Sequence, residues 1–407
     1  MARTVYRELQ GGAGFAALLG VLALFILGGL GSAWYMEHNG HIVTGMTNRI
    51  VWGMPHVFAV FLIVTASGVL NIASLSSVFG RTAYKPVARL SGLLAIAFLV
   101  GGLTVLVLDL GRPDRLIVAM TEYNFKSIFS WNIMLYIGFI AVVGAYLFVQ
   151  MERSMNRYAG TVGWFAFIWR LVLTTGTGSI FGWLVARQAY DAAVMAPLFI
   201  AMSLSFGLAA FLLIIMTVYG LTGRPLGDHI LNRLARLLGI FAAAVLYFTA
   251  LQHMTNLYAA EHAGVERFIL LEGGIYTALF WIGQVVLGGL VPIALVYTPQ
   301  TEKTRTGIAL ASALIIAGGF AQIYVIIVGG QATPLILFPG MEVQSSFQDG
   351  AIAAYMPSLP ELGLGIGGVA FALAIAAAGM KVLRFLPESL SDEVVDPHHR
   401  VGEVANP

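Results

Sequence analysis

VARLSGLLAIAFLVGGLTVLVLDLGRPDRL, residues 87–116, contains one apolar run with charged residues at both ends. No charge separates Arg89 from Asp109, and Arg112, Asp114 and Arg115 then follow within six residues. An apolar helix of about 20 residues spans the roughly 30 Å of hydrocarbon in a bilayer. The stretch therefore predicts a transmembrane helix that ends at a charged surface.

Similar apolar runs recur along all 407 residues, of which 58% are hydrophobic and 10% charged. That composition is too apolar for a soluble or nucleic-acid-binding protein of this length. Lipid allows only helices and closed barrels to span it, and these runs are too long for barrel strands. We therefore predict an all-α, multi-pass membrane protein of about ten spans, with lipid around it: 13–36, 51–76, 89–109, 129–150, 160–186, 193–219, 236–260, 268–298, 306–329 and 361–384.

The loops predict how the helices are oriented. Of the 22 Lys and Arg residues, fifteen lie on the side of the N-terminus, six lie on the opposite side, and Arg170 lies within a span. By the positive-inside rule both termini are cytoplasmic, and the DLGRPDR segment faces outward. The basic start before a long first run favours a retained helix over a cleaved signal peptide, so we expect the cytoplasmic membrane.

An internal echo predicts the grouping of the spans. VARLSGLLAIAF (87–98) resembles LARLLGIFAAAV (234–245), and each begins a helix on the cytoplasmic side. The second to fifth and the sixth to ninth spans then form two copies of a four-helix bundle that run in the same direction, a parallel repeat. The two remaining spans flank the bundles.

This grouping predicts how the protein is divided. We expect a membrane domain over 1–386, with a first bundle at 51–186 and a second at 193–329. Residues 387–407 are polar and are expected to form a loose cytoplasmic tail.

Polar side chains gather at the outer ends of the second to fifth spans. Ionisable groups inside a membrane are costly, so each is a candidate for a functional site. For Asp109 and Arg112, an interfacial ion pair at a helix stop is an equal alternative. We expect an outer binding pocket formed by the following residues: Trp52, His56, Asp109, Arg112, Trp131, Asn132, Arg187 and Gln188.

A second set of polar residues points inward from this pocket. Ser67 and Asn71 share a face of the second span with His56, and Arg170 lies near the middle of the fifth span with Thr174 on its face. These residues predict a proton path. The alternatives are hydrogen bonding between helices and a structural pair between Arg170 and a carboxylate.

The residue types also limit the cofactors. Without cysteine the protein holds no cysteine-ligated iron–sulfur cluster and no covalently attached c-type haem. His56 and His253 lie at similar depth and could ligate one haem b, which we do not expect. Neither a P-loop, a nucleophile elbow nor a zinc motif is present in a fitting context, so no catalysis or metal site of its own is predicted.

Five motifs together resemble the NrfD/PsrC family of quinone-interacting membrane subunits. They are NRIVWGMPHVFAVFLI (48–63), LDLGRPDRL (108–116), SIFSWN (127–132), FWIGQVVLGGLVP (280–292) and YVIIVGGQATPLILFPGMEVQSSFQDG with PSLPE (324–361). The ten-span length resembles the branch with DsrP, HybB and QrcD, and is most similar to DsrP of the DsrMKJOP complex.

The resemblance implies a function and partners. Members bind a quinone, menaquinone or ubiquinone, in the first bundle near the outer face. They exchange electrons there with a ferredoxin-like iron–sulfur subunit, within a complex that also holds cytochrome and catalytic-type subunits. The DsrP-like branch implies dissimilatory sulfur metabolism. Proton translocation is an open extension of this function.

The resemblance also implies roles for single residues. His56 matches the family's quinone-contacting histidine, whereas the family's asparagine and tyrosine have no clear match, and Trp52 lies four residues before His56. We expect His56 to bind one quinone oxygen, and Asp109, oriented by Arg112, to relay protons. Trp131 is expected to pack on the ring, and Asn132 to polarise the second oxygen.

Two other classes of function stay open at this point. A transporter or channel would show inverted repeats with broken helices, and a non-redox membrane anchor would bind no quinone.

Overall fold

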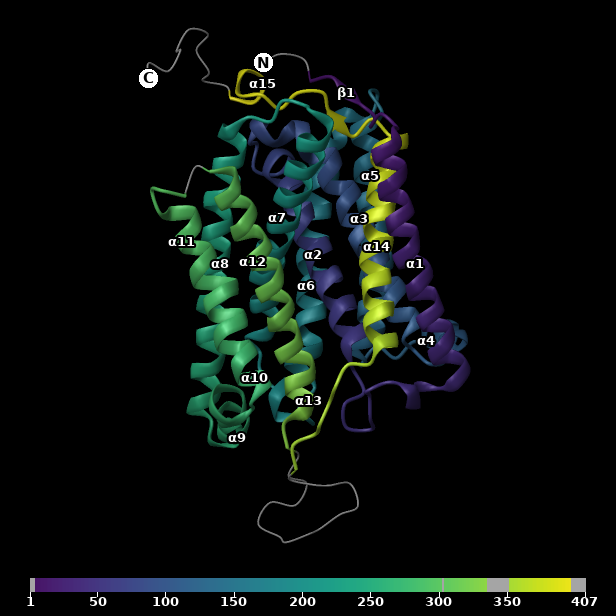
Figure 1. Ribbon diagram of the computed structural model, residues 1–407, viewed down its shortest axis with the longest axis vertical. Coiled ribbons are helices and arrows are strands. Elements are labelled where there is room, and N and C mark those ends of the chain that lie inside the picture. Colours follow the sequence, from purple (N-terminus) through teal and green to yellow (C-terminus); the bar gives the residue numbers. More distant parts are fainter. Residues whose placement is uncertain (1–3, 302–303, 335–350, 397–407) are drawn as a thin grey trace.

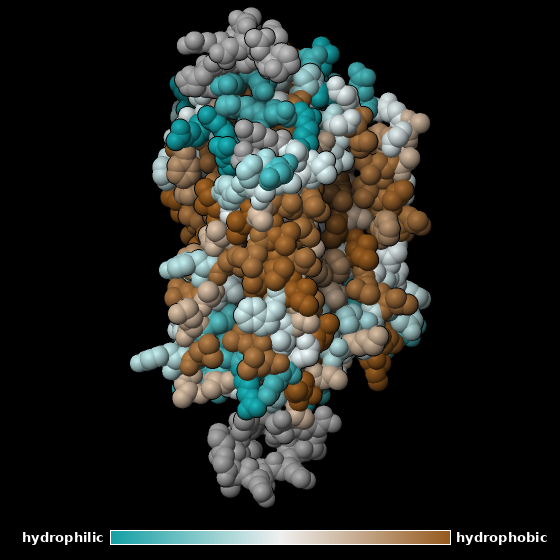
Figure 2. Space-filling model, turned by 60° about the vertical axis from the view of Figure 1, so that its left-hand side comes forward, coloured by the Kyte–Doolittle hydropathy of each residue, from teal (hydrophilic) through white to brown (hydrophobic). Residues whose placement is uncertain are grey.

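The structure is a computed structural model that describes residues 4–301, 304–334 and 351–396. Long helices run side by side along one axis, and sheet is limited to two short strands in the described residues (Figure 1). Figure 2 shows a hydrophobic belt around the middle of the molecule and a hydrophilic surface at the end that carries the termini. This confirms the prediction of an all-α membrane protein.

Nine helical segments in the described residues are long and apolar enough to cross a membrane. They are α1 (Ala13–Asn39), α2 (Met54–Ser77), η2–α3 (Thr82–Val87 and Ala88–Leu108), α5 (Ile128–Met151), α7 (Met195–Thr222), α8 (Asp228–Tyr258), α10–η8–α11 (Ile275–Ala278, Leu279–Leu290, Val291–Tyr297), α12–η9–α13 (Arg305–Tyr324, Val325–Gly329, Gly330–Ala332) and α14 (Leu359–Val382).

Helix α6 (Ala159–Trp183) corresponds to the remaining predicted span. It is long enough to cross, but it is not among the segments that are also apolar enough. Arg170 and several threonines and glycines lower its hydropathy, and Arg170 faces protein rather than lipid. The number of ten spans therefore stays a prediction.

The helices pack in two groups with α2 near the centre. Helices α2, α3, α5 and α6 contact one another, as do α7, α8, α12 and the α10–η8–α11 segment. The groups meet mainly where α2 crosses α7, at Gly68 and Gly207; a Cβ added to Gly207 would lie 2.1 Å from the carbonyl carbon of Gly68. Helices α1 and α14 pair with each other, and α14 lies against α3.

Short elements connect the long helices. They are η1 (His41–Val43), η3 (Pro113–Arg115), α4 (Leu116–Thr121), η4 (Asn156–Tyr158), η5 (Gln188–Tyr190), η6 (Ala260–His262), α9 (Ala263–Arg267) and η7 (Phe268–Glu272). Among these elements and the long segments, η7, η8 and η9 are π-helical.

The first and last described residues lie at the same end of the bundle (Figure 1). Strand β1 (Tyr6–Arg7) pairs antiparallel with β2 (Leu386–Pro387), and α15 (Asp392–Val395) follows. The prediction of a loose tail from 387 is wrong for residues 387–396, because Leu390 and Val395 are buried and anchor this segment. Residues 397–407 of that tail lie outside the described residues. We call the end away from the termini the outer end.

Candidate functional site

Hydrogen bonds from two distant segments fix the backbone at the outer start of α2. The side-chain Oε1 of Gln331 accepts from the N–H groups of Val51 and Trp52 at 2.9 and 3.0 Å, and its Nε2 donates to the carbonyl of Trp52 at 2.9 Å. From another direction, the N–H of Met54 donates to the hydroxyl of Tyr355 at 2.6 Å. The first turn of α2 is therefore held from both sides.

Glu361 organises the second of these segments. Its carboxylate is buried at the start of α14, where it forms a capping box with Ser358 and accepts from the hydroxyl of Tyr355 at 2.5 Å and from the N–H of Gly45 at 2.9 Å. Burial, followed by the nearby Glu361 carboxylate, raises the pKa of Tyr355, so its hydroxyl stays protonated. Tyr355 can thus donate to Glu361 while it accepts from α2.

Trp52 and His56 stack at this fixed turn. Their ring centroids are 5.2 Å apart, with an interplanar angle of 10°. Phe129 from α5, Phe181 from α6 and Tyr190 from η5 each lie 6.0 Å from the ring of Trp52. We call these five residues the aromatic cage.

The imidazole of His56 has no hydrogen bond to any described residue. It is partly buried, and its ring contact is the stack on Trp52. A neutral imidazole carries one donor and one acceptor nitrogen. His56 can therefore offer either one to a molecule that enters beside the cage.

Asp109 lies beside His41 rather than in the aromatic cage. An oxygen of its carboxylate is 3.8 Å from Nε2 of His41, and both residues line an open pocket of about 420 Å³. Val51, which precedes Trp52, lines the same pocket. The Asp109 carboxylate raises the pKa of His41, so this pair can hold or release a proton next to the start of α2.

Arg112 does not orient Asp109, so this part of the prediction is wrong. Its guanidinium donates to both carboxylate oxygens of Asp114, at 3.0 and 2.9 Å, and both side chains are exposed. Gly111 has φ +67°, a left-handed conformation that turns the backbone directly after Asp109. The pair belongs to a surface turn, and His41 is the residue beside Asp109.

Asn132 and Trp131 have partners other than those expected. The Asn132 amide donates to the carbonyl of Gly176 at 3.1 Å, which ties α5 to α6. Trp131 is 45% exposed, and its indole N–H donates to the carbonyl of Phe125 at 2.9 Å. Phe129, not Trp131, is the residue of α5 whose ring packs on Trp52.

Arg187 fastens the loops around the cage. Its guanidinium donates to the carbonyls of Gln331 and Arg49, at 3.0 and 2.8 Å. Gln188, the next residue, is exposed at the outer end. Arg187 therefore supports the segments that hold α2, and Gln188 faces solvent.

The four residues of the predicted proton path converge in one buried cluster between α2 and α6. Arg170 is 1% exposed and donates to the side-chain oxygen of Asn71 at 3.1 Å. The hydroxyls of Ser67 and Thr174 lie 2.5 Å apart. In the described residues, Arg170 is thus bonded to an amide, not to the carboxylate that the structural alternative required.

His56 and His253 do not face a common space. His253 lies in the second bundle, where its Nδ1 is 2.6 Å from a carboxylate oxygen of Glu266 and its ring packs on Phe280. His56 stacks on Trp52 in the first bundle. A haem held between these two histidines is therefore not supported, and the described residues contain no group of three or more His, Asp or Glu that could hold a metal ion.

The sequence reasoning missed the residues that build the site. Gln331 and Glu361 both lie in motifs that carried the family resemblance, but neither was assigned a role. The spacing Ser358-x-x-Glu361 is a capping-box signal just before an apolar run, and it could have placed Glu361 at a helix start. Nothing local in the sequence links Tyr190 to Trp52.

The comparisons with known proteins agree with this architecture. Residues 42–335 match the family described as polysulphide reductase, NrfD. The protein is 28% identical over 379 residues to an Hdr-like menaquinol oxidoreductase integral membrane subunit of Archaeoglobus fulgidus, and the match spans 92% of this protein and 95% of the relative. It is 25% identical over 308 residues to a membrane relative from the polysulfide reductase of Wolinella succinogenes, with 70% of this protein and 95% of the relative covered.

A third relative extends this range. It belongs to the selenate reductase of Mesobacillus selenatarsenatis and is 22% identical over 392 residues, which cover 87% of this protein and 88% of the relative. Because the family match spans well over half of the sequence and coincides with the helices of both bundles, the protein belongs to the NrfD family of multi-pass membrane subunits.

Proposed function

We propose that the protein is the quinone-interacting membrane subunit of a multi-subunit redox complex. Relatives that match most of its length are named as parts of a menaquinol oxidoreductase, a polysulfide reductase and a selenate reductase. The headgroup of the quinone binds beside the aromatic cage at the outer end of the first bundle. The choice between menaquinone and ubiquinone follows from the first relative, which favours menaquinone.

The observation that carries this proposal is the unbonded imidazole of His56 beside Trp52. A quinone ring packs well on aromatic faces, and each of its oxygens needs a hydrogen-bond partner. His56 provides a donor or an acceptor, and the Gln331 and Tyr355 bonds keep α2 from shifting it. A bound quinone supplies the two-electron, two-proton couple.

Protons exchange with the outer side through His41 and Asp109. Their pocket adjoins Val51 and is open, so water reaches both groups. The buried cluster around Arg170 lies 11 residues farther along α2 than His56, which is about 16 Å at 1.5 Å per residue. It provides polar groups for an inward proton route from the same helix.

Electrons come from or go to a partner at the outer end. The protein has no cysteine, so a cluster with cysteine ligands must belong to another subunit. We propose a ferredoxin-like iron–sulfur subunit there, with cytochrome and catalytic-type subunits beyond it. A place in dissimilatory sulfur metabolism follows from the DsrP-like motifs.

The test compares two tryptophan–histidine stacks in the intact complex. In His56→Ala, oxidation of a soluble naphthoquinol should fall by about 100-fold, the scale of one positioned proton-transfer group. In the control His38→Ala, it should be unchanged. His38 stacks on Trp34 at 5.3 Å and 7°, but this pair lies on the exposed face of α1.

Both variants must reach the membrane in wild-type amounts. Wild-type turnover in His56→Ala would remove His56 from the site. If the intact complex neither contains nor turns over any quinone, the protein is a non-redox anchor and the proposal fails.

A further inference from the structure

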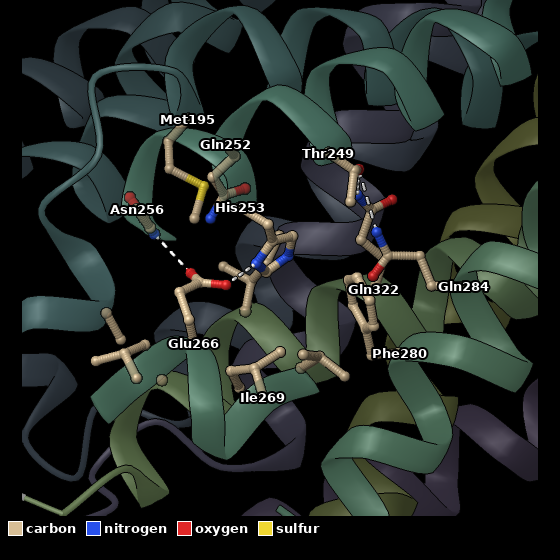
Figure 3. A pocket seen from close by; sticks show the side chains of 15 residues that line it. Met195, Thr249, Gln252, His253, Asn256, Glu266, Ile269, Phe280, Gln284 and Gln322 are labelled. Carbon is tan, nitrogen blue, oxygen red and sulfur yellow. Dashed lines mark hydrogen bonds and ion pairs between the residues drawn. The ribbon is translucent and has the colours of Figure 1, made fainter. Parts of the chain in front are cut away.

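A second polar site lies in the outer half of the second bundle, apart from the aromatic cage. Glu266 on α9 is 1% exposed, and both of its carboxylate oxygens are bonded (Figure 3). One lies 2.6 Å from Nδ1 of His253 on α8, and the other accepts from the amide of Asn256 at 2.9 Å. A buried carboxylate that is bonded to an imidazole is a natural place for a proton.

A small polar cavity opens beside this pair. Its volume is about 40 Å³, and Gln252, Gln284 and Gln322 line it together with Thr249. The hydroxyl of Thr249 accepts from both Gln284 and Gln322, at 3.2 and 3.3 Å (Figure 3). One water needs roughly 10–15 Å³, so the cavity has room for a few waters but not for a quinone ring.

The backbone around the cavity is unusual. Each π-helical segment in the described part of the protein contributes to its lining, with Ile269 from η7, Gln284 from η8 and Ile326 from η9. π-Helical turns are rare and occur frequently at functional sites. This convergence is independent of the Glu266 contacts and marks the same place.

A line of titratable groups connects the pair to the outer surface. His262 precedes Glu266 by four residues, so the two lie on one helical face. His262 is 7% exposed, and neither ring nitrogen has a hydrogen bond to a described residue. Its Nε2 lies 3.9 Å from a carboxylate oxygen of Asp191, which is 44% exposed.

The surroundings add little other charge. Among the described residues that line the cavity, His253 and Glu266 are the titratable ones, and α7 contributes Met195. Arg267 and Glu272 pair with each other on the exposed side of α9 and η7, and Glu261 on η6 is exposed.

We propose that His253 and Glu266 form a proton-binding site that exchanges protons with the outer side through His262 and Asp191. In the loaded form an imidazolium faces a carboxylate. On release, one proton leaves His253 for a cavity water, and a neutral imidazole stays hydrogen-bonded to the Glu266 carboxylate. The proton then passes to His262 and to Asp191 at the surface. This site requires no quinone, so it stands or falls apart from the function proposed above.

The experiment is infrared difference spectroscopy of the purified protein in lipid nanodiscs, titrated between about pH 5 and 9, where histidines change charge. Wild type should show linked imidazole and carboxylate bands. In Glu266→Gln the carboxylate band should disappear and the imidazole band should shift. In the control Glu272→Gln, which alters an exposed carboxylate on the same side, both bands should persist. Unchanged bands in Glu266→Gln would overturn the site.

The route is tested by the rate at which the bands respond to a pH jump. In Asp191→Asn and His262→Asn the response should slow several-fold, while its amplitude stays the same. These variants also carry the test if Glu266→Gln fails to accumulate, because absence of the coupled bands from both wild type and Asp191→Asn would overturn the proposal. An unaltered rate in both variants would refute the outer route.

Discussion

The side-chain amide of Gln331 brackets the peptide backbone of Trp52, accepting from its N–H at 3.0 Å and donating to its carbonyl at 2.9 Å. Gln331 belongs to the last turn of the α12–η9–α13 segment, 279 residues away from Trp52 in the sequence. The carbonyl of Gln331 accepts in turn from Arg187. The second bundle therefore sets the position of the aromatic cage in the first.

We predict that Gln331→Leu displaces Trp52 and lowers quinol turnover by about tenfold. The substitution leaves the N–H groups of Val51 and Trp52 without their acceptor, and each unsatisfied buried group costs about 1–3 kcal/mol. Thermal unfolding and turnover in the same preparation measure both effects. Gln188→Leu, in an exposed position next to Arg187, is the control and should change neither. Wild-type turnover in Gln331→Leu would show that the bracket does not position the cage.

We predict that Gly207→Val separates the two bundles. A Cβ on Gly207 would lie 2.1 Å from the backbone of Gly68 on α2, and backbone atoms do not move aside as the end of a flexible side group does. The variant should fail to give a monodisperse peak in detergent size-exclusion chromatography. Gly220→Val on the same helix has nothing within 4 Å of the added Cβ and should elute like wild type. Equal behaviour of the two variants would contradict the close crossing.

The helices were predictable because membrane spans are encoded locally. An apolar run of the required length identifies itself, and the structure places a helix at every predicted span. The packed segment 387–396 was not predictable, because its few apolar residues are buried only by pairing with β1, far away in the sequence. The π-helical turns carry no sequence signal that the periodicity could detect.

The site was predictable only in part. His56 and Arg170 stood out because polar groups are costly in apolar helices, and their helices carry them to the outer turn and the buried cluster. Arg112 was misassigned because sequence proximity to Asp109 does not reveal the turn at Gly111. Gln331 and Tyr190 reach Trp52 only through tertiary packing, which a single sequence does not show.

We predict a pH-dependent contribution of His41 to stability. The Asp109 carboxylate raises the pKa of His41 above its ordinary value of 6.5, so the folded state binds the proton more tightly than the unfolded state. This stabilisation is fully present below pH 6.5 and is lost as the pH rises through the raised pKa. At low pH, wild type should unfold about 1–2 °C above His41→Gln, as expected for a partly exposed pair.

The difference should vanish at alkaline pH, where His41 is neutral in both states. His38→Gln, on the exposed face of α1, controls for general effects of losing a histidine. A His41→Gln difference that is constant with pH would contradict the coupling to Asp109.

We predict that the iron–sulfur partner docks at the outer end. The protein has no cysteine, so a single cysteine introduced at Phe125 can carry a cross-linker without other labelling. Phe125 is 65% exposed near the start of α5. In native membranes it should capture a subunit with cysteine-ligated clusters, identified by mass spectrometry. Phe79, 54% exposed at the end nearer the termini, is the matched control and should not capture it. The reverse pattern would place the partner on the other side.

We predict that the Arg170 cluster is strongly coupled to Asn71. Removing the amide in Asn71→Leu leaves a buried guanidinium without its side-chain acceptor and should destabilise the protein by about 3–5 kcal/mol. Arg170→Met removes the charge itself and leaves no ion behind, so it should cost less. The double variant should then be more stable than Asn71→Leu alone, because the unpaired charge is gone. Thermal unfolding of the four proteins in one detergent gives the coupling energy. Additive effects would mean that another group compensates the charge of Arg170.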